Sequence, residues 1–170
     1  METKRLNNEH FVSPTLGRLP VGKMIKEITK FVKEDEKSFY RLVIGTDSQV
    51  RKLNGVAECD YVTAIIIHRK GHGARYFWRK EKVKVPPVLR EKIYKETTIS
   101  LDTAEHLVPD LRRSINGSGK YELEIHIDVG KHGPTREMIR EVVGMVVGSG
   151  YTAKTKPDSW GASSVADKHT

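Results

Sequence analysis

The stretch YRLVIGTDSQ, residues 40–49, decides the fold. Its first part, residues 40–45, is rich in apolar side chains, which is typical of a strand that is buried on both faces of a sheet. Asp47 follows at the carboxyl end of this strand, where open α/β sheets bind their ligands. The stretch therefore predicts an α/β fold with a functional carboxylate, although an aspartate at a strand end also commonly caps a turn.

The other elements follow from the spacing of apolar residues on either side of this strand. In chain order they are a helix at 21–34, strands at 40–45, 61–68 and 74–85, a helix at 86–108 closed by Pro109, a strand at 121–129, a helix at 135–147, a strand at 151–156 and a helix at 158–168. After the leading helix the order is βββαβαβα, which predicts a five-stranded mixed sheet flanked by helices. Residues 1–20 are polar and broken by prolines, so we expect a flexible N-terminal arm before a single domain at 21–170.

Bulk composition narrows the function further. The net charge of +8 favours polyanionic partners, because Lys and Arg release counterions from phosphates, although a protein can be basic without such a partner. The single cysteine excludes an internal disulfide and a thiolate zinc site. The sequence shows neither the apolar core of a signal peptide nor the ~20 apolar residues that span a bilayer. We therefore expect a cytoplasmic protein without membrane contact.

Asp128 and Glu96 are the second and third acidic candidates. Asp128 lies at the end of the strand at 121–129, so it meets Asp47 at one edge of the sheet if the two strands are parallel. Glu96 falls on the apolar stripe of the helix at 86–108, counted at about 100° per residue, and a carboxylate buried there needs a partner. The plainer interpretations are a solvated strand face for Asp128 and a structural ion pair for Glu96.

Two positions in this acidic pattern stay open. Asp158 follows the last strand and is the fourth candidate, although aspartate is also a preferred helix N-cap, and Asp167 is its alternative. Glu91 and Glu105 point away from the apolar stripe, so the choice of Glu96 depends on helical geometry. Oxygen ligands of this kind suit Mg²⁺ or Mn²⁺, and two such ions about 4 Å apart activate water and stabilise the leaving oxygen of a phosphodiester.

Four stretches of the chain resemble the bacterial YkuK family of the ribonuclease-H-like superfamily. They are IGTDSQV from Ile44, LREKIYKET from Leu89, EIHIDVGKHGPTREMI from Glu124 and KPDSWGASSVADKHT from Lys156. The resemblance covers nearly all of residues 21–170. It implies a ribonuclease-H-like fold and a metal-dependent nuclease activity, with the superfamily's metal-binding acids at Asp47, Glu96, Asp128 and Asp158.

Functions from different classes fit these observations. The leading one is a two-metal nuclease acting on RNA, an RNA–DNA hybrid or structured DNA, with Asp47 bridging both ions, Glu96 and Asp128 on one ion and Asp158 on the other. The cations expected to contact phosphates without reading bases are Arg51, Lys52, Arg79, Lys80 and Lys131. The second function is a nucleic-acid-binding module that has lost catalysis. An actin-like nucleotide-binding protein fits less well, because it needs two similar domains and the sequence has no repeat. The oligomeric state stays open.

Overall fold

The computed structural model describes residues 9–83, 88–117 and 119–169, and for residues 53, 162, 166 and 167 it describes the backbone but not the side chain. The strands are β1 (His10–Ser13), β2 (Gly17–Pro20), β3 (Phe39–Leu53), β4 (Val56–Arg69), β5 (Ala74–Val83), β6 (Lys120–His126) and β7 (Thr152–Lys154). The helices are α2 (Val21–Glu34), α3 (Leu89–Ile115), the 3-10 turn η1 (Arg136–Met138), α4 (Ile139–Gly148) and α5 (Trp160–His169). In the part of the chain so described, no helix is both long and apolar enough to cross a membrane.

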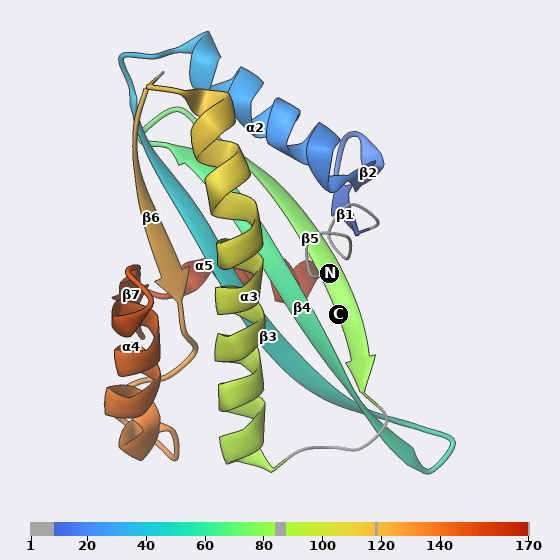
Figure 1. Cartoon of the computed structure of the whole chain (residues 1–170). Coiled ribbons are helices and arrows are strands. Elements are labelled where there is room, and N and C mark those ends of the chain that lie inside the picture. Colours follow the sequence, from blue (N-terminus) through green and yellow to red (C-terminus); the bar gives the residue numbers. More distant parts are fainter. Residues whose placement is uncertain (1–8, 84–87, 118, 170) are drawn as a thin grey trace.

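One mixed sheet, in the order β2-β1-β5-β4-β3-β6-β7, forms the middle layer of the molecule. Strands β3, β4 and β5 pair with one another in antiparallel fashion, whereas β6 pairs in parallel with β3 and β7 in parallel with β6. Helices α2 and α3 lie across one face of the sheet and α5 lies on the other (Figure 1). The predicted mixed sheet with helices on both faces, and the parallel pairing of its two inner strands, are confirmed.

The expected number of five strands is wrong, because a hairpin in residues 10–20 adds two strands to the sheet. Strand β1 joins the edge of β5 through the pair Val12 and Trp78. The side chain of Phe11 is 1% exposed and packs into the main core, which fixes a segment that looks polar in the sequence. Gly17 supplies the positive φ of 71° that the tight turn between the two strands requires. Residues 1–8 of the expected arm lie outside the described residues.

The long helix α3 does not end at Pro109 as predicted but continues through it to Ile115. Proline lacks an N–H, so one hydrogen bond is lost at an exposed position. Leu111 and Ile115 are buried against the sheet, and their packing outweighs that loss. The helix ends at Asn116, whose left-handed backbone (φ 44°) closes the last turn. The prolines predicted to open the helix, at 86 and 87, lie outside the described residues.

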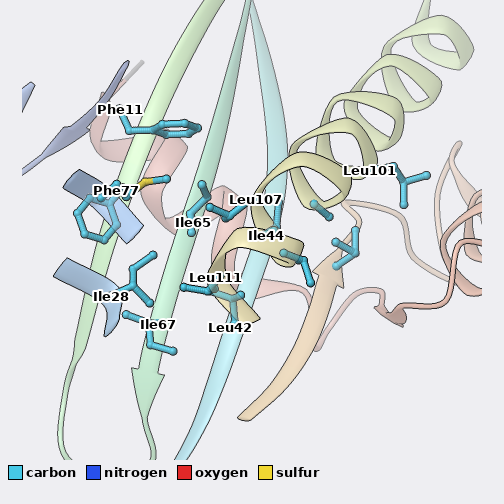
Figure 2. Packing of buried hydrophobic residues seen from close by; sticks show 14 of the residues in the cluster. Phe11, Ile28, Leu42, Ile44, Ile65, Ile67, Phe77, Leu101, Leu107 and Leu111 are labelled. Carbon is cyan, nitrogen blue, oxygen red and sulfur yellow. The ribbon is translucent and has the colours of Figure 1, made fainter. Parts of the chain in front are cut away.

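The alternation of side chains along β3 decides which face of the sheet each site residue occupies. Figure 2 shows Leu107 and Leu111 of α3 beside Ile44 of β3, in the main core between the helices and the sheet. Val43, one residue earlier, faces the other way and packs with Val165 of α5 in a smaller core. Even-numbered residues of β3 therefore face α3, and odd-numbered residues face α5.

Candidate active site

Parallel pairing of β3 and β6 places two of the predicted acids in matching positions. The paired register ends at Gly45 and His126, and Asp47 and Asp128 each lie two residues further along their chains. The backbone N–H of Ser48 donates to Asp47 Oδ1 at 2.9 Å, which holds one oxygen of this carboxylate in place. Asp128 lies two residues beyond β6, as expected, whereas Asp47 lies inside β3, because that strand continues to Leu53 in its pairing with β4. The predicted end of this strand at residue 45 is therefore wrong, and it is only the pairing with β6 that ends there.

Glu96 reaches β3 from α3, on the face of the sheet opposite to the side chain of Asp47. Glu96 is 3% exposed, and its Oε1 accepts a hydrogen bond from the hydroxyl of Ser48. Ser48 faces α3, as the other even-numbered residues of β3 do. One turn further along α3, Ser100 bonds Thr46 at 2.8 Å, so two side-chain contacts hold the helix against β3. The other carboxylate oxygen of Glu96, Oε2, has no hydrogen-bond partner within the described residues.

The pKa of Glu96 is raised by its burial and, to a smaller extent, by two of the predicted acids. Burial raises the pKa of this carboxyl to about 8, and the negative charges of Asp47 and Asp128 act in the same direction. The hydrogen bond from Ser48 and the charge of Lys92 oppose this effect. On the same helix Glu91 and Glu105 are exposed, so the helical phase that singled out Glu96 is confirmed.

Lys156 is a cation of this site that sequence reasoning missed. Its ammonium Nζ lies 2.9 Å from Asp128 Oδ1. The hydrogen bond to Asp128 raises the pKa of Lys156, and the charges of Asp128, Asp47 and Glu96 add to the effect. The backbone N–H of Lys156 donates to the carbonyl of Val129 at 2.8 Å, so the chain after β7 extends the pairing beside β6 and carries Lys156 to the acids. The spacing of residues in the sequence does not predict this ion pair between Lys156 and Asp128.

The donor set fits a hard divalent cation. Asp47, Glu96 and Asp128 offer oxygen ligands of the kind that Mg²⁺ and Mn²⁺ prefer. The oxygen of Glu96 that lacks a partner in the described chain, and the mutual repulsion of the three carboxylates, are features that a bound cation relieves. As they stand, no three Asp, Glu, His or Cys side chains among the described residues are grouped closely enough to hold a metal ion. The charges of Asp47 and Asp128 act on Glu96, but the described residues do not form a closed metal cage.

Asp158, the fourth predicted acid, lies in a pocket that it shares with Lys156, the partner of Asp128. It is exposed, and its backbone N–H donates to the carbonyl of Thr155 at 2.8 Å. The pocket has a volume of about 680 Å³ and is lined by Gly130, Lys131, His132, Thr155, Lys156, Pro157 and Asp158. The charges that shift the pKa values of Glu96 and Lys156 most do not include Asp158. The side chain of Asp167, its predicted alternative, lies outside the described residues.

Two of the predicted phosphate-binding cations share a buried partner. Asp60 on β4 is 2% exposed, and its Oδ2 lies 3.1 Å from Nε of Arg51 and 4.0 Å from Nζ of Lys80. Asp60 pairs with Gln49 in the sheet, which puts this ion group on the same face as Asp47. Nothing in the spacing of residues predicts a buried aspartate inside this strand.

The remaining predicted cations, Arg79, Lys52 and Lys131, differ in how exposed they are. Arg79 contacts Glu9 and lies over the ring of Phe11 at 5.3 Å, so it stabilises the N-terminal hairpin on the face opposite Asp47. Lys52 and Lys131 are exposed, the first near the tip of the β3–β4 hairpin and the second in the pocket beside the acids. Their positions are open to a polyanion.

His126, the last residue of β6, is enclosed in a structural network. Its ring is buried, Nε2 lies 3.0 Å from Glu124 Oε2, and Nδ1 accepts the backbone N–H of Gly161 at 3.1 Å. Burial lowers the pKa of this imidazole, opposed by Glu124. A Cβ at Gly161 would lie 2.7 Å from Val43, so glycine is what lets α5 approach the sheet.

Comparison with known proteins agrees with this architecture. The family model described as "Ribonuclease H-like" matches residues 23–170. The chain is 37% identical over 156 residues to "Uncharacterized protein YkuK" of Bacillus subtilis (strain 168), covering 86% of this chain and 88% of the relative. No solved structure matches the chain. This chain is a YkuK-like member of the ribonuclease H-like family.

Proposed function

We propose that this protein is a divalent-metal-dependent nuclease that hydrolyses the phosphodiesters of nucleic acid. The observation that supports this most is the buried carboxyl of Glu96, which lies beside the charges of Asp47 and Asp128 and has one oxygen without a partner in the described residues. Burying a carboxylate next to like charges is costly unless a cation accompanies it. Membership of the ribonuclease H-like family points to nucleic acid as the partner.

Each residue of the site has a role in this proposal. Asp47, Glu96 and Asp128 would hold Mg²⁺ or Mn²⁺, and Asp158 would serve a second ion. When bound, such ions activate a water molecule and stabilise the leaving oxygen. Ser48 orients two ligands at once, because its hydroxyl donates to Glu96 and its backbone N–H to Asp47.

Mn²⁺ binding is the direct test. At a hundredfold excess over Kd we expect Mn²⁺ to raise the Tm of the wild type by about 5–10 °C, and Asp128→Asn to lose most of that shift. Calorimetric titration counts the ions, with two per chain expected in the wild type and one in Asp158→Asn. Asp102→Asn, an exposed aspartate of α3, is the matched control. A wild type that neither binds Mn²⁺ nor cleaves RNA, hybrid or branched DNA would refute the proposal.

Nucleic-acid binding is expected to fall steeply as salt rises. Each phosphate contact releases counterions, so the slope of log affinity against log salt counts the contacts. Lys52→Ala and Lys131→Ala are each expected to reduce this slope by about one, whereas Arg79→Ala leaves it unchanged because Arg79 is engaged with Glu9. Fluorescence anisotropy in a chelator, between low and physiological salt, measures the slopes. A flat salt response would speak against nucleic acid as the partner.

A nucleic-acid-binding module without catalysis is the second candidate. The ion pair between Lys156 and Asp128 favours it, because it neutralises one acid of the site without a metal ion. This alternative predicts nucleic-acid binding that does not change when Mn²⁺ is added, together with no cleavage of any substrate.

A further inference from the structure

The ammonium of Lys156 lies beside one of the candidate metal-binding carboxylates, that of Asp128. Its Nζ is 2.9 Å from Asp128 Oδ1, while its side chain is 57% exposed. Lysine carries a flexible four-carbon stem, so a side chain this exposed can change partners without moving the backbone. A divalent ion held by Asp128 repels this ammonium and competes for the same carboxylate.

The same side chain lines the pocket beside the acids. Lys131 and His132 lie in this pocket of about 680 Å³ together with Lys156, and Asp158 is the acid on its wall. Gly130 packs closely against the aliphatic stem of Lys156. A Cβ at this glycine would lie 3.3 Å from the Cβ and 3.6 Å from the Cδ of Lys156. The pocket thus gathers two ammonium groups with room for the stem of Lys156, which suits a phosphate.

We propose that Lys156 has two alternative partners, Asp128 in the metal-free protein and a nucleic-acid phosphate in the adjoining pocket when a divalent ion occupies the acids. This inference rests on the proposed function, and it assigns Lys156 as a phosphate-contacting residue of the site. A phosphate oxygen replaces the carboxylate oxygen as the acceptor of the ammonium, so the charge of Lys156 stays paired in both states.

The test measures two affinities of the Lys156→Ala variant, for Mn²⁺ and for nucleic acid, and we expect the substitution to change them in opposite directions. Without the competing ammonium, we expect Mn²⁺ to bind the variant about fivefold more tightly, the size of effect typical of an exposed ion pair. Without the phosphate contact, we expect a short labelled RNA–DNA hybrid to bind about fivefold more weakly in Ca²⁺. Ca²⁺ shares the preference for oxygen ligands, and a gel confirms that the hybrid stays intact.

Lys154→Ala is the matched control, because it removes the same charge two residues earlier and Lys154 forms no ion pair with an acid among the described residues. We expect it to change both affinities less than twofold. A Lys156→Ala variant with both affinities unchanged, or both weakened together, would overturn the inference while leaving the nuclease intact. If neither wild type nor variant binds Mn²⁺, the metal site itself fails and the inference fails with it.

Discussion

Replacing Asp47 with asparagine is expected to abolish divalent-dependent cleavage, with a loss well beyond about a hundredfold. Mutating residues that merely support metal ligands costs about 10–100-fold, so losing the charge of a ligand shared by the ions costs more. Asparagine keeps the size of the side chain and an acceptor for the N–H of Ser48. The metal-free fold is therefore expected to survive, with its stability level or higher because repulsion among the acids falls.

The assay compares wild type and variant on RNA, hybrid and branched DNA with Mg²⁺ or Mn²⁺, alongside thermal melts in a chelator. Asp102→Asn controls for the loss of an aspartate as such, since this residue is exposed on α3 away from β3. Nucleic-acid affinity in the chelator should not fall in either variant. A wild type that cleaves nothing, together with an Asp47→Asn variant that melts lower, would assign Asp47 a structural role and favour the binding module.

The parts of the site that the sequence predicted are those governed by local periodicity. The run of apolar residues before Asp47 marks a central strand, and its parallel partner carries Asp128 to the matching position. The helical phase of Glu96 is equally local, because about 100° per residue decides which face a side chain occupies. These features depend on neighbours in the chain and on the preference of apolar surface for the interior.

The features that the sequence did not predict depend on contacts between distant residues. The N-terminal hairpin exists because Phe11 reaches the main core and Val12 pairs with Trp78, and neither contact follows from the composition of a short polar segment. The ion pair of Lys156 with Asp128 joins two loops that meet only once β7 lies beside β6. The low helix propensity of proline predicts that the helix ends at Pro109, whereas the packing of residues further along α3 outweighs this propensity.

The stability of the metal-free protein is expected to fall as the pH rises from about 4.5 to about 8. The ordinary pKa of a glutamate is 4.5, and burial raises that of Glu96 to about 8 in the folded protein. Between these values the unfolded chain releases its proton while the folded protein keeps it, so each rise in pH favours unfolding. Below this window Glu96 is protonated in both states, and above it the loss is complete, at roughly 5 kcal/mol or less.

Glu96→Gln is expected to remove this loss, because glutamine is nearly the same shape and does not ionise. Urea unfolding in a chelator should give wild type and variant similar stabilities near pH 4.5 and a more stable variant near pH 9. Glu91→Gln, an exposed glutamate on the same helix, should follow the wild type throughout. Adding Mn²⁺ near pH 9 should stabilise the wild type and leave Glu96→Gln almost unchanged, because the ion replaces the proton as the positive partner of Glu96. Parallel pH curves for wild type and variant would show that Glu96 is ionised in the folded protein at ordinary pH, and the main support for the metal site would be lost.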